Sequence, residues 1–403
     1  MMNDMAKDGD MKGASKKRLV PELRFPEFEQ DGEWEEKRLG DLCEIGNGKD
    51  YKHLNKGRIP VYGSGGYMTS VDAFLYDGDS VCIGRKGTID RPIFLTGKFW
   101  TVDTLFYTHS FCCCLPKFLY WVFQQIDWYR YNEAGGVPSL SKKTIENIKH
   151  SFPSSAEQQK IAECLSSMDE EISAMKEKVE QLKIYKKGLM QKLFPVAGKF
   201  VPELRFPKFK KDWDVDSMQS MFDMKNGYTP SKSNPTYWDN GTIPWFRMED
   251  IRKNGHILSD SIQHVTQQAV KNSGLFPAYS IIVATTATIG EHALVIVDSL
   301  ANQRFTFLTK RKSFKDKINM MYFHHYMFII DEWCKKNTNS GGLVSVNMPA
   351  FKQLLIPFPS PAEQQKIADS LSSIDELISL YENKVILLEQ HTKGLMQQLF
   401  PKL

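Results

Sequence analysis

Apolar residues recur at alternating intervals of four and three positions through two long segments of the chain, residues 161–193 and 367–399. Over about five heptads, this spacing places the apolar side chains at the a and d positions of a coiled-coil helix. Lys186 and Thr392 interrupt the two stripes at equivalent places. The predicted seam consists of Ile161, Leu165, Met168, Ile172, Met175, Val179 and Leu182 in the first segment, and of Ile367, Leu371, Ile374, Ile378, Tyr381, Val385 and Leu388 in the second.

Local signals set the ends of both helices. Pro153 precedes the first stripe and Pro361 the second, while a Phe-Pro pair follows each stripe at 194–195 and 400–401. Because proline suits the first turn of a helix but stops it further on, we predict two helices of about 37 residues, each about 55 Å long. One chain supplies both stripes, so we expect an antiparallel intramolecular pair. An ordinary two-helix core or a homodimeric coiled coil would bury the same residues.

The long helices belong to a larger internal repeat. Val-Pro-Glu-Leu-Arg-Phe-Pro at residues 20–26 returns unchanged at 201–207, and most of the block 152–195 returns at 358–401. The segments between these blocks barely match, which indicates one scaffold that carries two related but different working surfaces. The run Ala-Glu-Gln-Gln-Lys-Ile-Ala starts both helices and retains polar positions outside the seam. This retention suggests a second shared contact, such as two copies of one partner protein.

The two variable regions share a skeleton of short segments that are rich in β-branched residues and separated by Gly, Pro or Asn. Such segments are typical of strands and turns. Residues 115–129 and 318–334 are expected to form apolar helices, although aromatic strands would fit the same composition. The matched segments are 59–62 with 243–246, 80–89 with 280–289, 101–106 with 301–306, and the glycine turn 135–139 with 341–345.

The predicted fold class is therefore α+β. It has two variable α/β domains in tandem, separated by two long helices that form an antiparallel intramolecular coiled coil, with pseudo-two-fold symmetry. The predicted boundaries are a disordered tail at 1–19, the first variable domain at 20–150, the first helix at 151–197, the second variable domain at 198–357 and the second helix at 358–403.

Composition changes this picture little. The 403 residues carry a formal net charge of +4, which permits a nucleic-acid partner without demanding one. No apolar run is long enough to cross a membrane, and the lysine-rich start lacks the apolar centre of a signal peptide. The seven cysteines include no Cys-x-x-Cys pair, so we expect neither a disulfide framework nor zinc, and a reducing cytoplasm as the setting.

Loop chemistry differs where the two skeletons agree. Arg85 and Lys86 in the first region occupy the places of Thr285 and Thr286 in the second. Arginine can bond guanine bidentately in the major groove, threonine can address other base edges, and lysine more often meets phosphates. A constant fold with changing loops would suit two readers of different DNA sequences, although most surface cations are simply solvated. The candidate DNA-contacting residues are Lys49, Lys52, Lys56, Arg58, Arg85, Lys86, Arg247, Arg252, Lys253, Thr285, Thr286 and Arg304.

Catalytic signatures are incomplete. Asn-Pro-Thr-Tyr at 234–237 resembles the Asn-Pro-Pro-Tyr signature of adenine methyltransferases, but it lacks the second proline and an upstream glycine loop for the methyl donor. The chain has no Gly-x-x-x-x-Gly-Lys-Ser/Thr phosphate loop, and its nine histidines show no Cys, Asp or Glu at metal-ligand spacing. We therefore expect no catalytic residue, metal or cofactor in this chain. A self-contained methyltransferase or nuclease is the weakest hypothesis.

The repeated motifs resemble those of the DNA-specificity subunits of Type I restriction–modification enzymes. The resemblance covers residues 20–403 and is carried by the Pro-Glu-Leu-Arg-Phe-Pro openings, the Glu-Gln-Gln-Lys-Ile-Ala helix starts and the Lys-Gly-Leu-Met-Gln-x-Leu-Phe-Pro endings. It implies a non-catalytic subunit whose two target recognition domains each read one half of a split double-stranded DNA site. It also implies helices that dock two methylation subunits, which use S-adenosylmethionine to methylate adenine, and two restriction subunits, which use ATP and Mg. No DNA-contacting residue carries over from the family.

A rigid rod with unlike domains near its ends would imitate a dimeric DNA reader within a single chain. Dimeric readers place half-sites about one helical turn, or about 34 Å, apart, and the predicted helix length is compatible with that distance. Because the two domains differ, we expect an asymmetric rather than a palindromic target. The competing hypothesis is an architectural coiled-coil scaffold that binds proteins and has no role on DNA.

Overall fold

The computed structural model describes residues 18–196, 199–272, 274–339 and 344–402. These residues form two compact units, each of which combines one variable region with parts of both long helices. The first unit extends to residue 177 and resumes at 382, and the second comprises 178–381. The tail predicted at 1–19 lies outside the described residues except for its last two, and the glycine pair at 341–342 also lies outside them.

The first unit contains two four-stranded sheets, with strand orders β2-β9-β6-β7 and β4-β3-β8-β5. Helix α1 (Pro116–Gln125) and the short helix α2 (Lys142–Asn147) follow the last strand of these sheets and precede the strand that leads into the first long helix. The strands are β1 (Glu35–Arg38), β2 (Glu44–Asn47), β3 (Lys56–Gly63), β4 (Gly66–Val71), β5 (Tyr76–Asp77), β6 (Ser80–Gly84), β7 (Ile93–Leu95), β8 (Lys98–Thr101), β9 (Leu105–His109) and β10 (Lys149–Phe152).

The second unit contains a five-stranded sheet of order β12-β19-β16-β17-β14 and a three-stranded sheet of order β15-β13-β18. Its helices are α4 (Met218–Met221), α5 (Met248–Asn254), α6 (Met320–Lys336) and α7 (Met348–Gln353). The strands are β11 (Asp214–Ser217), β12 (Phe222–Asn226), β13 (Ile243–Phe246), β14 (Ile257–Leu258), β15 (His264–Val265), β16 (Ser280–Ala284), β17 (His292–Val295), β18 (Leu300–Ala301), β19 (Phe305–Lys310), β20 (Thr338–Asn339), β21 (Ser345–Val346) and β22 (Leu355–Phe358).

Both variable regions have the predicted α+β composition, and the two apolar segments are helices, α1 and α6, rather than strands. The regions also share a parallel strand pair, β3 beside β8 in the first and β13 beside β18 in the second. A further antiparallel pair, β1 with β10 or β11 with β22, joins the start of each region to the strand that leads into a long helix. The segments matched in sequence therefore occupy matched strands.

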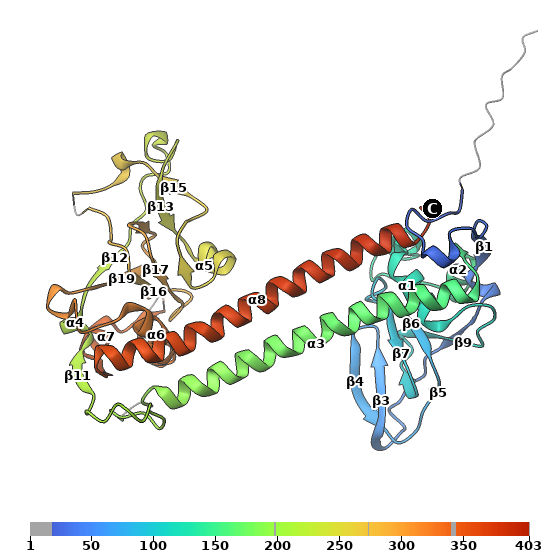
Figure 1. The fold of residues 1–403 in the computed structure, drawn as a ribbon, viewed down its shortest axis with the longest axis horizontal. Coiled ribbons are helices and arrows are strands. Elements are labelled where there is room, and N and C mark those ends of the chain that lie inside the picture. The colour runs from blue at the N-terminus through green and yellow to red at the C-terminus, as the bar shows by residue number, and fades with distance from the viewer. Residues whose placement is uncertain (1–17, 197–198, 273, 340–343, 403) are drawn as a thin grey trace, which may run out of the picture. The chain divides into compact units, whose positions relative to one another are not determined.

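The long helices begin and end where the proline signals predict. Helix α3 spans Ser155–Leu193 and helix α8 spans Pro361–Leu399. Within each unit, a segment of α3 lies beside a segment of α8 (Figure 1). All of the predicted seam residues are buried or partly buried.

The helices run antiparallel in both units. In the first, Ile161 near the start of α3 shares a core with Leu399 near the end of α8, whereas Met168 lies against Thr392. In the second, the seam cluster of Val179, Ile374 and Ile378 is flanked by Leu182, Leu189 and Tyr381. The predicted antiparallel intramolecular pair is confirmed, because each stripe is covered by the other.

The two residues that interrupt the stripes are satisfied at the seam. Lys186 Nζ lies 2.5 and 2.6 Å from the two carboxylate oxygens of Asp375. The Thr392 hydroxyl donates to the Leu388 carbonyl oxygen of its own helix at 2.8 Å. A polar side chain can therefore occupy a seam position without leaving a buried group unpaired.

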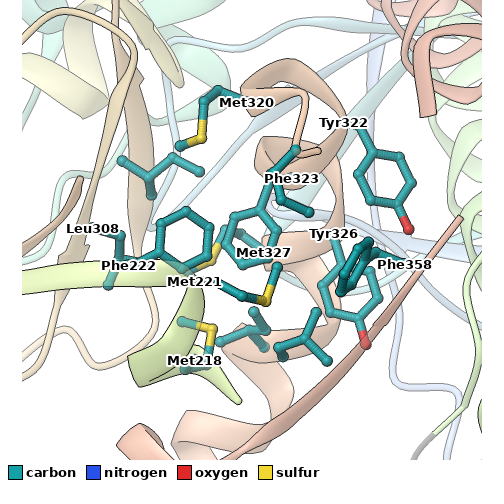
Figure 2. Packing of buried hydrophobic residues seen from close by; sticks show 14 of the residues in the cluster. Met218, Met221, Phe222, Leu308, Met320, Tyr322, Phe323, Tyr326, Met327 and Phe358 are labelled. Atoms are coloured by element: carbon teal, nitrogen blue, oxygen red, sulfur yellow. The ribbon is translucent and has the colours of Figure 1, made fainter. Parts of the chain in front are cut away.

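Each unit has its own aromatic core beside the long helices. In the first, Phe118 of α1 stacks on Phe400, with ring centroids 5.4 Å apart. In the second, Phe222 of β12 meets Phe323 of α6 at 4.5 Å, and Met221 and Met327 pack in the same cluster (Figure 2). The ends of the long helices are thus parts of the domain cores as well as of the seam.

The polar residues repeated at each helix start are buried and bonded within their own unit. Arg24 donates to the two carboxylate oxygens of Glu157 at 2.8 and 2.7 Å, and Arg205 donates to those of Glu363 at the same two distances. Both glutamates are 1% exposed. The repeated opening at 20–26 or 201–207 is therefore tied to the start of a long helix.

The glutamine that follows each of these glutamates holds the residue that caps a domain helix. Gln158 accepts a hydrogen bond from the backbone N–H of Leu115 before α1, and Gln364 accepts one from that of Asn319 before α6, at 3.0 and 2.8 Å. Each side-chain amide also donates to two backbone carbonyl oxygens. Internal bonds therefore account for the retention of Glu157, Gln158, Glu363 and Gln364, whereas the repeated Gln-Lys pairs at 159–160 and 365–366 are exposed, and the expected contact with a partner protein stays a prediction.

Candidate nucleic-acid interface

The loops that carry the predicted Arg-Lys and Thr-Thr pairs rest on the same backbone framework in both units. The backbone N–H of Arg85 donates to the carbonyl oxygen of Thr104 at 2.8 Å, and that of Thr285 donates to Arg304 at 3.1 Å. These bonds make the two loops equivalent position by position. Three further backbone N–H to carbonyl hydrogen bonds of the first unit have a counterpart in the second. Lys49 to Thr101 is matched by Tyr228 to Ala301, Val102 to Tyr62 by Asn302 to Phe246, and Leu140 to Arg85 by Val346 to Thr285.

An Asn-Gly dipeptide reaches this framework in both units, at 47–48 after β2 and at 226–227 after β12. A Cβ atom at Gly48 would collide with the carbonyl oxygen of Val102, and one at Gly227 would collide with that of Ala301. Only glycine allows the two chain segments to pass this closely. The shared dipeptide therefore reflects shared backbone geometry.

In the first unit the framework opens into a groove of about 670 Å³. Asn47, Arg85, Lys86 and Phe106 line one part of it, and the glycine turn that ends at Ser139 lines another. The Arg85 guanidinium carbon lies 5.9 Å from the centre of the Phe106 ring, a distance at which the ring attracts the cation. The groove thus presents two exposed cations beside an aromatic ring.

In the second unit the positions of Arg85 and Phe106 hold Thr285 and Thr306, which are buried and belong to a neutral polar network. The Thr306 hydroxyl donates to the side-chain oxygen of Asn226 at 2.8 Å, and the Thr285 hydroxyl lies 3.3 Å from that of Thr306. Thr286 forms a β-bridge with Ser345, just as Lys86 does with Ser139 in the first unit. At the positions of Arg85 and Phe106 the second unit therefore carries Thr285 and Thr306, whereas its exposed cation, Arg304, stands at the position of Thr104.

The other predicted cations of the first unit are exposed but more dispersed. Lys49 directly follows β2 and joins the framework through its backbone. Lys52 lies in the turn before β3, and Lys56 and Arg58 lie on β3, which belongs to the second of the two sheets. The prediction that all four contact DNA is not tested by this arrangement.

In the second unit, Arg304 is exposed and belongs to the framework, whereas three predicted cations lie around α5. Arg247 is already engaged, because it pairs with Glu249 at 3.0 Å and its guanidinium carbon lies 5.9 Å from the Trp245 ring. Arg252 and Lys253 are exposed on α5.

Several residues of the framework were missed from the sequence, namely Asn47, Thr104, Phe106, Asn226 and Thr306. A usable signal existed, because the match of 101–106 with 301–306 already pairs Thr104 with Arg304 and Phe106 with Thr306. What the sequence did not indicate is that these positions lie beside Arg85 and Thr285.

The surroundings of the incomplete methyltransferase motif are those of a turn. The Asn234 side-chain oxygen accepts hydrogen bonds from the backbone N–H and the hydroxyl of Thr236, at 3.2 and 2.8 Å. Across the described ranges, no three or more His, Cys, Asp or Glu side chains are grouped to hold a metal ion. None of the helices in those ranges is long and apolar enough to span a membrane.

A row of histidines crosses the second unit. Ring centroids are 5.7 Å apart for His256 and His292, 5.6 Å for His292 and His324, and 5.5 Å for His324 and His325. Burial lowers the pKa of His292 to about 4 and that of His325 to about 3, and it holds the pKa of His324 well below its ordinary value. His292, His324 and His325 are therefore neutral packing groups at neutral pH.

The sequence matches a known protein family over most of its length. The family described as the Type I restriction modification DNA specificity domain matches residues 31–183 and 210–390. The chain belongs to this family. Each matched stretch contains one variable region and most of the long helix that follows it, so the DNA specificity domain occurs twice in the chain.

Similar proteins carry related descriptions. The specificity subunit of the Type I restriction enzyme EcoprrI from Escherichia coli is 46% identical over 165 residues, which cover 41% of this chain and 40% of that protein. The MjaIX specificity subunit from Methanocaldococcus jannaschii is 33% identical over 183 residues, which cover 44% and 40%. The chain therefore matches about two fifths of the length of these relatives.

The two specificity domains also have a fold counterpart. The S subunit of a Type I restriction–modification system from M. genitalium aligns with a TM-score of 0.66 at 15% sequence identity. The alignment covers 96% of this chain and 100% of that chain. At this identity the likeness concerns the fold, with its tandem domains and long helices.

Proposed function

We propose that this chain is the sequence-specific DNA-binding subunit of a Type I restriction–modification complex, and that it recognises an asymmetric bipartite target. Each variable region reads one half of the target, and the chain itself performs no chemistry. The observation that carries this proposal is the matched framework with unmatched surfaces. Exposed Arg85 and Lys86 have Thr285 and Thr286 at the same backbone positions of the second unit, and exposed Arg304 has Thr104 at its position in the first. Two surfaces of different chemistry suit two different half-sites.

The charge of the first groove supports a DNA partner over a protein partner. Lys86 and Lys142 line the groove together with Arg85. Cations at such a place can neutralise phosphates while a guanidinium addresses a base edge. Binding should therefore weaken with salt, because each neutralised phosphate releases counterions.

We further propose that the long helices dock two methylation subunits, which bring S-adenosylmethionine, and two restriction subunits, which bring ATP and Mg. Apolar side chains that are exposed on these helices, outside the seam, support a protein partner. Examples are Ile184 at 70% exposure, Leu380 at 63% and Leu387 at 64%. All seven cysteines are free thiols, which suits assembly in a reducing cytoplasm.

Exchange of one variable region tests the proposal. Residues 43–150 would be replaced by the equivalent region of another specificity subunit, and methylated adenines would be mapped in cells that also carry the methylation subunit. The expected result is a new sequence in one half of the methylated target and an unchanged sequence in the other half.

The reciprocal exchange of residues 222–353 is the matched control and should change only the other half. A change in both halves, or in neither, would refute the modular reading of the target. Binding to DNA without any sequence preference would instead favour an architectural scaffold.

A further inference from the structure

In each domain one backbone hydrogen bond joins an arginine and a threonine, and the two residue types change places between the domains. In the first domain, the bond joins Arg85, in the loop after β6, to Thr104, just before β9. In the second, it joins Thr285, in the loop after β16, to Arg304, just before β19. Each domain therefore has one exposed arginine and one threonine at this place, but on opposite sides of the bond, and Thr104 is partly exposed whereas Thr285 is buried.

Both guanidinium groups are free to bind a ligand. Arg85 and Arg304 are exposed, and no carboxylate of the described residues lies within ion-pair distance of either. The carboxylate of Glu133, which also lines the first groove, accepts a hydrogen bond from the Thr144 hydroxyl. An arginine without an acidic partner, placed on a fixed backbone, is suited to a bidentate acceptor supplied from outside.

The backbone beneath the exchanged pair is held firmly in both domains. The residue after Arg85 bridges to Ser139 and the residue after Thr285 bridges to Ser345. The next residue has a positive φ in both cases, 93° at Gly87 and 64° at Ala287. Because the main chain takes the same unusual path, the difference between the domains lies in the side chains rather than in the loop shape.

We propose that Arg85 and Arg304 are specificity-determining residues, each of which reads a guanine in its own half of the target. The O6 and N7 atoms of guanine form a bidentate acceptor in the major groove that matches the arginine fork. Moving the guanidinium to the other side of the hydrogen bond moves the base pair that it addresses. This inference rests on the proposed function and assigns a base and a residue to each half-site.

Selection from a randomised duplex library tests the assignment. The probe is the full chain bound to its own methylation subunit, and the bound duplexes are sequenced. Arg85→Thr should reduce the guanine preference at one base pair of the first half-site by about tenfold to a hundredfold and leave the second half-site unchanged. Arg304→Thr should do the same in the second half-site only.

The double exchange Arg85→Thr with Thr104→Arg conserves charge and composition. It should give the first half-site a guanine preference at a different base pair, with the same salt dependence of binding. Arg85→Lys keeps the exposed charge but removes the fork, so it should bind with weakened discrimination. The matched control is Arg38→Thr, because Arg38 pairs with Asp41 beside β1, away from the framework.

Three results would overturn the inference while leaving the proposed function intact. One is equal weakening of all library members by Arg85→Thr, which would identify a phosphate contact. Another is an unchanged target with both arginine variants, and the third is complete loss of binding with Arg85→Lys as well as Arg85→Thr. Failure of the proposed function has a separate signature, because the unaltered complex would then select no split sequence.

Discussion

In the first unit Arg24 binds Glu157 through two hydrogen bonds of 2.8 and 2.7 Å, and in the second Arg205 binds Glu363 through two bonds of the same lengths. The framework at the candidate DNA surface has matched backbone hydrogen bonds in both units, yet it carries Arg85 where the other unit carries Thr285. This contrast indicates where each kind of sequence constraint acts. Residues that hold the long helices to the domains repeat, whereas side chains that face outward from the framework do not.

The comparison extends into the interiors. The second unit buries His324 and His325, whereas the first buries His150 on β10, beside Phe400, and this burial lowers the pKa of His150. Divergence is therefore not confined to the surface. Parts of the core that support only one variable region are free to change, as long as they remain packed and neutral.

The largest expected effect tests the repeated anchor. Glu157→Ala and Glu363→Ala each leave a guanidinium without its partner, and the side chains of Arg24 and Arg205 are only 8% and 19% exposed. Breaking a buried ion pair in this way should lower the free energy of unfolding by about 3–5 kcal/mol. Urea denaturation of the full chain measures the loss, which should be somewhat larger for Glu157→Ala.

The control for this anchor is Glu27→Ala, which removes an exposed pair with Lys160. It should leave the denaturation midpoint unchanged, because exposed pairs contribute little. If either anchor variant behaved like this control, the two anchors would not be equivalent and the repeated opening would need another explanation.

The second prediction is that acidification destabilises the second unit more than the first. On acidification the unfolded chain takes up protons near the ordinary histidine pKa of about 6.5, whereas His292 and His325 in the folded chain stay neutral down to about 4 and about 3. The folded state therefore loses stability as the pH falls below about 7. Between pH 7 and pH 6 His292, His324 and His325 together should cost the second unit about 2 kcal/mol, more than the single lowered pKa of His150 costs the first.

Hydrogen exchange, corrected for its intrinsic pH dependence, measures this difference by comparing α6 with α1 in the full chain. Three charged side chains influence protonation of the histidine row. Lys186 of α3 disfavours protonation of His324 and His325, and Asp331 and Lys335 of α6, which affect His292, pair with each other. His324→Leu should reduce the acid sensitivity of α6. Opening of α1 at a higher pH than α6 would contradict the prediction.

The smallest effect concerns the interrupted seam. In a double-mutant cycle, Lys186→Met and Asp375→Asn should show a coupling free energy of about 0.5–1 kcal/mol, because the two side chains are 21% and 41% exposed and the pair is partly screened. The equivalent interruption, Thr392, makes its hydrogen bond within α8. Its hydroxyl also lies 3.9 Å from Met168 Sδ across the seam, a weak contact, so Thr392→Val and Met168→Leu should show a smaller coupling than the charged pair. A coupling as large as that of the charged pair would contradict this contrast.

The sequence predicted the helices and their pairing because heptad spacing is a local pattern that survives in any context. The proline signals fixed both ends of α3 and α8, and the repeat paired the strands of one region with those of the other. Of the candidate surface, Arg85, Lys86, Thr285, Thr286 and Arg304 share the matched framework. The cations of β3 and α5 were predicted to contact DNA by the same criterion, a charge expected in an exposed loop. That criterion does not indicate whether a residue lies close to the framework in space.

The repeated polar residues show the limit of such reasoning most clearly. Glu157 and Gln158 look like surface residues, since they lie outside the apolar stripe of a long helix. In the fold they are buried, because the opening segment and the residue before α1 lie against them. Periodicity along one helix indicates which face meets the other helix, but not which further segments cover the remaining faces.

By itself the amino-acid sequence determined the two apolar stripes, their ends, the duplicated plan and the change of loop chemistry between the copies. All of these follow from interactions over a few residues or from comparing one half of the chain with the other. The tertiary structure alone decided that a glutamate on each helix belongs to an arginine more than 130 positions away. It also decided that Arg85 faces Thr104, as Thr285 faces Arg304, because such contacts arise only when strands distant in sequence pair in register.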